Sequence, residues 1–221
     1  MKISPKIIRV DAYRPGSEAI KQAAAIIQSG GVVVFPTACL YGLGADAMDR
    51  QAVERLFEIK HRSTGKPILV LIHNLSQLQQ LVRFIPVAAE KLINRFWPGQ
   101  VTLIFQALRS LPEALTAGSA KIGVRLAGHP TAVELLQAVG RPLTGTSANL
   151  SDQPGCADIF KLDRVMAEGV DLILDAGRLE GGRGSTIVDV TVNPPVVIRE
   201  GVVAASHIQA ALAKRGKGID K

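Results

Sequence analysis

Apolar residues along this chain fall into two kinds of pattern. In one they recur every three or four positions, as at Ile20, Ala23, Ala24 and Ile27, which is the spacing of one helix face. In the other, several apolar residues follow one another and end at a turn residue, which is typical of a buried strand. The helical pattern occurs in residues 17–29, 49–60, 76–83, 86–96, 130–139, 158–168 and from about 206 onward. The strand pattern occurs in residues 32–35, 68–72, 101–105, 122–126, 170–174, 185–190 and 196–199.

The order of these patterns indicates an α/β fold. Helices and strands interleave without a strict alternation, which predicts a mixed, twisted sheet flanked by helices. Neither an internal repeat nor a long linker interrupts the 221 residues, a length that suits one domain. We expect this domain to span residues 1–205. A C-terminal helix and basic tail follow over residues 206–221, with no additional C-terminal domain.

Polar groups gather at the ends of two of the predicted strands. The strand at 32–35 stops at Pro36 and opens into a glycine-spaced segment, residues 36–44, which we expect to be a loop. The strand at 68–72 is preceded by a group of basic residues, Lys60, His61, Arg62 and Lys66. Buried strands that deliver polar and basic residues at one end are typical of a site built on a rigid sheet.

The charge of the chain indicates an anionic partner. There are 26 Lys and Arg against 19 Asp and Glu, which gives a net charge of +7. Nucleic acid, a nucleotide or acidic lipid would suit this excess, and so would a soluble enzyme with a basic tail, because residues 214–221 hold four of the cations. Aromatic residues make up only 4%, which argues against a surface that stacks single-stranded bases.

Cysteine content and hydropathy indicate the cellular compartment of the protein. Cys39 and Cys156 match no paired metal spacing and no disulfide framework, so we expect reduced thiols. The N-terminus lacks the apolar region of a signal peptide, and no run approaches the roughly 18 apolar residues that cross a bilayer. We therefore expect a cytoplasmic protein without a membrane partner.

Familiar phosphate and hydrolase motifs are absent from the sequence. Thr64-Gly65-Lys66-Pro67 is similar to the end of a P-loop, but Lys60 stands where the first glycine belongs, and Pro67 replaces the magnesium-binding hydroxyl. No G-x-G-x-x-G opens a helix, and no G-x-S-x-G is present. A covalent nucleophile is not indicated.

The remaining chemistry is electrostatic. Arg125 and Arg199 end later strands and, with Lys60, Arg62 and Lys66, would form a cradle for an anion. The alternative for each is a solvated surface charge. Residues 146–149 (Thr-Ser-Ala-Asn) and 181–185 (Gly-Gly-Arg-Gly-Ser) are either ligand-binding loops or ordinary turns and caps. The residues alone thus support an α/β protein that binds an anion or a nucleotide.

Several motifs that occur in a fixed order identify a family more specifically than any single residue or loop named above. From about residue 17 to residue 201 the chain resembles the YrdC/TsaC family of threonylcarbamoyl-AMP synthases. The segments that carry the resemblance are GGVVVFPT..LYGLG, Lys60-His-Arg62 followed by Lys66-Pro67, FWPGQVTLIF, GVRLAGHP, TSANLS, GGRGSTIVD and VIREG.

The resemblance implies a YrdC-like fold around a large, open, basic cavity. It also implies condensation of L-threonine, bicarbonate and ATP into L-threonylcarbamoyladenylate, with release of pyrophosphate assisted by Mg²⁺. The expected partners include a threonylcarbamoyl-transferase complex, which would modify tRNA next to the anticodon, and direct contact of the cavity with tRNA or double-stranded RNA. Such chemistry needs positioned substrates and neutralised phosphate charge, which agrees with the basic residues found.

Carried over position by position, the resemblance also assigns residues to the substrates. Those at threonine-binding places are Thr37, His73, Arg125 and Ser185. Those at ATP-binding places are Lys60, Arg62, Thr64, Lys121, Ser147, Asn149 and Arg199. Lys60 and Arg62 would also be the catalytic residues, and no metal ligand is expected from the protein.

The chain departs from the family pattern beside the threonine place. Family members usually carry an acid and then Thr or a similar residue after Pro-Thr, whereas this chain has Ala38 and Cys39. Ser63 also stands where Pro is common. Two alternatives to the synthase therefore remain, an RNA-binding paralogue without chemistry and a paralogue that adenylates another carbamoylated compound.

Overall fold

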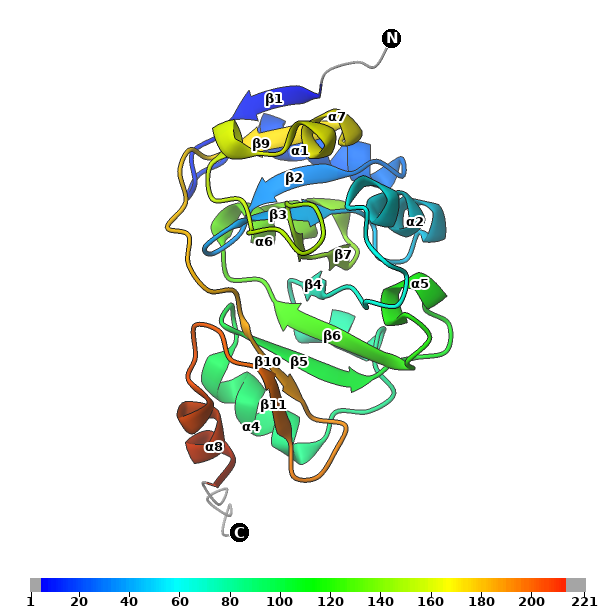
Figure 1. The fold of residues 1–221 in the computed structure, drawn as a ribbon, viewed down its shortest axis with the longest axis vertical. Coiled ribbons are helices and arrows are strands. Elements are labelled where there is room, and N and C mark those ends of the chain that lie inside the picture. Colours follow the sequence, from blue (N-terminus) through cyan, green and yellow to red (C-terminus); the bar gives the residue numbers. More distant parts are fainter. Residues whose placement is uncertain (1–4, 214–221) are drawn as a thin grey trace.

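The structure is a computed structural model, and it describes residues 5–213. Its strands form two hydrogen-bonded sheets, one in the upper and one in the lower half of Figure 1. The final helix, α8 (Ala205–Ala213), begins where the sequence predicts it. The predicted basic tail lies outside the described residues. Within residues 5–213 every helix is too short or too polar to cross a membrane.

The upper sheet has five strands. Their order is β1 (Lys6–Arg9), β9 (Leu172–Asp175), β2 (Val33–Pro36), β3 (Tyr41–Gly44) and β8 (Thr146–Ser147). β9 runs parallel to β1 and β2, whereas β3 is antiparallel to β2 and β8. Helices α1 (Ser17–Gln28) and α6 (Pro130–Val139) share an apolar core with β2 and β9 on one face. Helices α2 (Arg50–Ile59) and α7 (Arg164–Gly169) belong to the core that includes the other face.

The lower sheet has six strands. Their order is β11 (Val196–Arg199), β10 (Thr186–Asp189), β5 (Val101–Gln106), β6 (Lys121–Leu126), β4 (Val70–Ile72) and β7 (Leu143–Thr144). β10–β5 and β4–β6 are parallel pairs, and the other three pairs are antiparallel. Helices α4 (Val87–Phe96) and α8 pack against one face, in a core that includes Leu103 and Val124. The mixed α/β class expected from the sequence is confirmed, with the strands divided between two sheets.

Local sequence explains where the longer helices begin. Asp49 precedes α2, and its carboxylate accepts hydrogen bonds from the backbone N–H groups of Gln51 and Ala52, as expected of an N-cap. Pro130 is the first residue of α6, where its missing N–H is not needed. Gly140 ends α6 with a φ of 75°, a conformation that glycine adopts without strain.

One expectation about the upper sheet is wrong. The sequence predicts a loop over residues 36–44, but Tyr41–Gly44 form β3, which pairs with β2 and β8. Its glycines are required by packing, because a Cβ at Gly44 would lie 2.6 Å from Cε1 of Phe35. The same glycines that let the strand pass over this ring gave the segment the composition of a loop.

Smaller elements also differ from the expected pattern. Residues 158–168 divide into a 3₁₀ turn (Ile159–Lys161) and α7, because the Asp163 carboxylate caps a new helix by accepting from Val165 and Met166. Helix α3 (Leu75–Gln79) is shorter than predicted. Strand β1 and helix α5 (Glu113–Thr116) were not expected, because β1 has only two apolar residues in a row and α5 is a single turn.

Candidate functional site

A cavity of about 960 Å³ lies between the two sheets. Its floor is one face of the lower sheet, to which alternate residues of each strand contribute, because side chains two positions apart in a strand share a face. These residues are Thr102 and Ile104 of β5, Lys121, Gly123 and Arg125 of β6, Ile187 of β10 and Arg199 of β11. The intervening residues, such as Leu103 and Val124, are buried in the apolar core on the opposite face.

The other walls come from the upper sheet and from loops. Residues 37–40 and strand β3 contribute one wall, β8 contributes Ser147, and the segment before β4 contributes Arg62 and Leu69. Residues 180–185 form a rim that joins β9 to β10. This rim is tied to the opposite wall, because the backbone N–H of Gly181 donates to the carbonyl of Cys39 at 2.9 Å.

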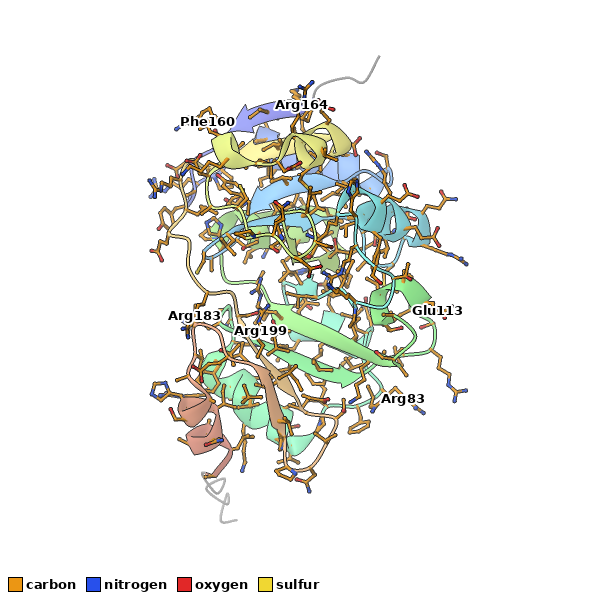
Figure 2. All side chains as sticks on the ribbon, in the orientation of Figure 1. Arg83, Glu113, Phe160, Arg164, Arg183 and Arg199 are labelled. Atoms are coloured by element: carbon orange, nitrogen blue, oxygen red, sulfur yellow. The ribbon has the colours of Figure 1, made fainter. Side chains whose placement is uncertain are left out.

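The charged residues of the cavity wall are mostly cations. They are Arg62, Lys121, Arg125, Arg183 and Arg199, with Glu180 as the acid. Arg199, labelled in Figure 2, is the last residue of β11 in the lower sheet. The Lys121 ammonium is paired with Asp189 at 2.8 Å, and Arg183 faces Glu200 at 3.8 Å.

Arg125 and Arg199 have no ion-pair partner among residues 5–213. Arg199 donates to the carbonyl of Ser185 at 2.8 Å, which leaves other N–H groups of its guanidinium available. Burial is the main cause that lowers the pKa of Arg125, to about 10. The charge of Arg199 lowers this pKa further, whereas an electrostatic interaction with Cys39 raises it. The Arg125 guanidinium is still protonated at neutral pH, so this part of the cavity presents positive charge to an anion.

Arg62 reaches the cavity from the end of α2. His61 has a φ of 48°, and the chain turns there out of the helix. The Arg62 guanidinium donates to the carbonyls of Lys66 and Pro67, at 3.0 and 2.8 Å, which fixes its position at the cavity wall. Burial lowers its pKa, an effect that nearby Asp152 opposes.

Lys60, two residues earlier, is placed differently. Its side chain is 1% exposed, and its ammonium donates to the carbonyls of Ser147 and Asn149, both at 2.6 Å. Lys60 follows Val53, Leu56 and Phe57 at helical spacing, so it continues the buried face of α2. It lies behind the wall that the described residues form.

Three further predicted residues also lie outside that wall. The Thr64 side chain is on an exposed turn. His73 has Nε2 at 2.8 Å from the amide nitrogen of Asn74. The Asn149 amide donates to the carbonyls of Leu150 and Gln153, both at 2.7 Å, and its oxygen accepts from the Ser147 hydroxyl.

The other predicted residues come together in the wall, although they are far apart in the sequence. They are Thr37, Arg62, Lys121, Arg125, Ser147, Ser185 and Arg199. The Thr37 hydroxyl donates to the carbonyl of Leu40 at 2.6 Å, and the Ser185 hydroxyl lies 2.8 Å from that of Thr102. Their roles toward substrates stay predictions.

Sequence reasoning missed part of the wall. Gly123 interrupts a buried strand, and an isolated glycine in a strand marks a close approach by another group, so this signal was present. Arg183 belongs to residues 181–185, which the sequence already offered as a ligand-binding loop, whereas only the tertiary structure places Glu180 at the cavity rim.

A protein-family model described as Telomere recombination, which spans Sua5, YciO and YrdC, matches residues 25–201. The chain belongs to the Sua5/YciO/YrdC family. The threonylcarbamoyl-AMP synthase of Pyrococcus abyssi is 35% identical over 208 residues, which are 91% of this chain and 61% of that protein. The chain thus spans about three fifths of the length of this synthase and of that of Bacillus subtilis.

Solved structures of family members have the same fold. P. abyssi Sua5 in complex with L-threonine superposes with a TM-score of 0.89 at 35% identity, over 94% of this chain and 61% of that one. Escherichia coli YciO superposes with a TM-score of 0.82 at 31% identity, over 90% of this chain and 97% of that one. The latter protein is described as uncharacterized.

Proposed function

We propose that this Sua5/YciO/YrdC protein makes L-threonylcarbamoyladenylate from L-threonine, bicarbonate and ATP, with release of pyrophosphate. The observation that carries the proposal is the cavity. Its volume of about 960 Å³ accommodates a nucleotide and an amino acid together, and its cations come from β6 and β11 of the lower sheet and from two loops. Similarity to synthases over most of the chain and to Sua5 with bound L-threonine supports the choice of substrates.

The proposed chemistry uses positioning and charge. The threonine amine combines with bicarbonate to give a carbamate and water. A carbamate oxygen then attacks the α-phosphorus of ATP, which forms the new P–O bond as the bond to pyrophosphate breaks. Arg62, Lys121 and Arg199 would neutralise phosphate charge, and Arg125 would hold the threonine carboxylate. The enzyme would thereby be a nucleotidyltransferase.

We propose that Mg²⁺ enters the cavity bound to ATP. Among residues 5–213 no group of three or more His, Cys, Asp or Glu side chains could hold a metal ion. Mg²⁺ usually binds through substrate phosphates and water with one or two carboxylates, so the triphosphate would bring the ion into the cavity. There it would stabilise the charge on the departing pyrophosphate.

The product would serve tRNA modification. We infer that a separate transferase complex takes the threonylcarbamoyl group to tRNA, because the adenylate is a mixed anhydride and hence an activated donor of that group. A cytoplasmic location would suit this use of ATP and tRNA. Direct contact of the cavity with tRNA or double-stranded RNA remains part of the proposal.

Pyrophosphate release tests the function. With ATP and Mg²⁺ present, we expect release only when L-threonine and bicarbonate are supplied together, because the carbamate is the nucleophile. Mass spectrometry should detect threonylcarbamoyladenylate. Equal release without bicarbonate would contradict the proposal.

A second candidate is adenylation of a different carbamoylated compound. Ala38 and Cys39 border the cavity next to Thr37, at the place where the sequence departs from the family pattern. A panel of amino acids in the same assay separates the candidates. A higher rate with another amino acid than with threonine would favour the second.

A further inference from the structure

Arg183 is a cation of the cavity wall to which the proposed function gives no role. It lies on the rim, residues 180–185, which joins the two halves of the molecule (Figure 2). Its side chain is 75% exposed, and its ion-pair partner among residues 5–213 is Glu200, at 3.8 Å. This distance is longer than a hydrogen bond, and a pair of exposed side chains holds neither of them firmly. The Arg183 guanidinium is therefore available to a ligand.

The backbone is anchored on either side of Arg183 but not at Arg183 itself. The N–H of Gly181 donates to the opposite wall, and the carbonyl of Gly184 accepts from the N–H of Val202 at 3.1 Å. Within the described part of the chain, the backbone groups of Gly182 and Arg183 form no hydrogen bond. Gly181 and Gly182 have φ values of 75° and 97°, and a Cβ at Gly182 would have no atom within 4 Å. Two adjacent glycines in open space allow this short segment to change direction.

The anchor that follows Arg183 lies beside a second cation. Arg199 donates to the carbonyl of Ser185 at 2.8 Å, and a Cβ at Gly184 would lie 3.2 Å from Nη2 of Arg199. Arg183 thus leaves the backbone one residue from a point that the Arg199 guanidinium reaches. Two guanidinium groups in one region favour a ligand with several adjacent anionic oxygens, because each can donate two parallel hydrogen bonds to a phosphate.

We propose that Arg183 turns about Gly181 and Gly182 onto the β- and γ-phosphates of bound ATP, where it stabilises the charge that develops as pyrophosphate leaves. Arg183 is then a catalytic residue, a role whose consequence for turnover rests on the proposed function. The alternative is a solvated surface charge. Arg178 offers a matched control, because it is an exposed arginine of the same connection that lies outside the cavity wall.

Binding of inorganic pyrophosphate and of AMP, each with Mg²⁺, tests the phosphate contact without turnover. In Arg183→Gln we expect the Kd for pyrophosphate to rise at least tenfold and the Kd for AMP, which lacks the outer phosphates, to change less than twofold. Arg183→Lys keeps the charge without the planar fork and should give an intermediate Kd for pyrophosphate. Arg178→Gln removes the same charge and should leave both constants within twofold. Calorimetric titration measures them, and an unchanged pyrophosphate affinity in Arg183→Gln, or an equal loss in Arg178→Gln, would overturn the proposal.

Amide hydrogen exchange and kinetics test the movement and its use. Pyrophosphate should slow exchange at residues 182–184 at least tenfold in the unmodified protein and have little effect there in Arg183→Gln. In turnover, Arg183→Gln should lower kcat roughly a hundredfold, with less than a threefold change in the KM for threonine. Unchanged exchange at residues 182–184 would show that the rim does not close, and an unchanged kcat would refute the catalytic role. If the unmodified protein forms no adenylate, the proposed function fails by itself, and binding and exchange still decide whether Arg183 closes on pyrophosphate.

Discussion

Arg62, Lys121 and Arg199 each reach the cavity while part of their hydrogen-bonding capacity is used by the protein itself. Arg62 and Arg199 donate to backbone carbonyls, and Lys121 pairs with Asp189. These bonds fix the side chains before a ligand arrives, which lowers the entropy cost of binding. Arg125, without an ion-pair partner among the described residues, retains the most capacity for a substrate carboxylate.

At the same scale, the two cysteines should differ in reactivity. Cys39 is partly exposed at the cavity wall, whereas Cys156 is buried and its Sγ donates to the Asp158 carbonyl at 3.0 Å. Burial is the main cause that raises the pKa of Cys156, which leaves it a poor nucleophile. We expect iodoacetamide to label Cys39 at least tenfold faster than Cys156, and ATP with threonine to slow that labelling. Mass-spectrometric mapping measures both rates.

Matched variants complete this test. Cys39→Ser should stay active and resist inactivation by a bulky maleimide, while Cys156→Ser should remain sensitive. Full activity after complete modification of Cys39 would remove this residue from the site.

The lowered pKa of Lys60 leads to a prediction of how the free energy of unfolding changes with pH. Burial, and secondarily Arg62, lowers its pKa from the ordinary lysine value of 10.5 to about 8. Between these values the unfolded chain holds more protons than the folded one, so the free energy of unfolding should rise with pH over this window. Relative to Lys60→Met, the gain should approach about 3 kcal/mol. Urea unfolding from pH 7 to 10.5 measures the difference, and parallel curves for the two proteins would contradict it.

Strand β6 shows how one element serves both the core and the site. Ile122 and Val124 face the apolar core, and Lys121, Gly123 and Arg125 face the cavity. Gly123 pairs with Ile104, and a Cβ there would lie 3.4 Å from Cγ2 of Thr102, which is tight but tolerable. The missing side chain keeps the floor open between two cations.

Filling this position should block the cavity without unfolding the protein. We expect Gly123→Leu to lower pyrophosphate release at least a hundredfold, because its side chain occupies substrate space. The free energy of unfolding should change by less than about 1 kcal/mol, since the new side chain points away from the core. Gly123→Ala is the control and should retain most activity. Normal turnover by Gly123→Leu would show that substrates do not reach the floor.

Across the whole molecule, the cavity is enclosed by walls from both sheets. Residues from β3 and β8 above meet residues from β5, β6, β10 and β11 below, and the rim at 180–185 joins the two. A ligand that touches both sides binds only the assembled fold, so it should stabilise the protein as a unit.

Thermal unfolding tests this coupling. ATP at a hundred times its Kd should stabilise the folded protein by about 2.7 kcal/mol. For a chain of this length, that corresponds to a rise in Tm of about 5–10 °C. Adenosine at the same concentration should give a smaller shift, because it lacks the phosphates that the cations would bind. Equal shifts by the two ligands would show that phosphate contacts contribute little.

The sequence by itself determined the longer elements and the Asp49 cap of α2. Helical periodicity located α1, α2, α4 and α6, and apolar runs located most strands, because both signals depend on neighbours a few residues away. The motif residues were identified as candidates by family resemblance, and seven of them line one cavity.

Tertiary structure decided what depends on distant partners. β8 is a strand only because it pairs with β3, a segment remote in the chain, and its two residues are too few to show a period. β3 pairs with β8 and with its neighbour β2, although its glycines are typical of a loop. The division into two sheets, with the cavity between them, follows from pairings that no local pattern encodes. Lys60 and Arg62 are two residues apart, yet one is held by the carbonyls of residues 147 and 149 and the other by those of 66 and 67. Which of them faces the cavity was settled by the acceptors that the folded chain brought to each.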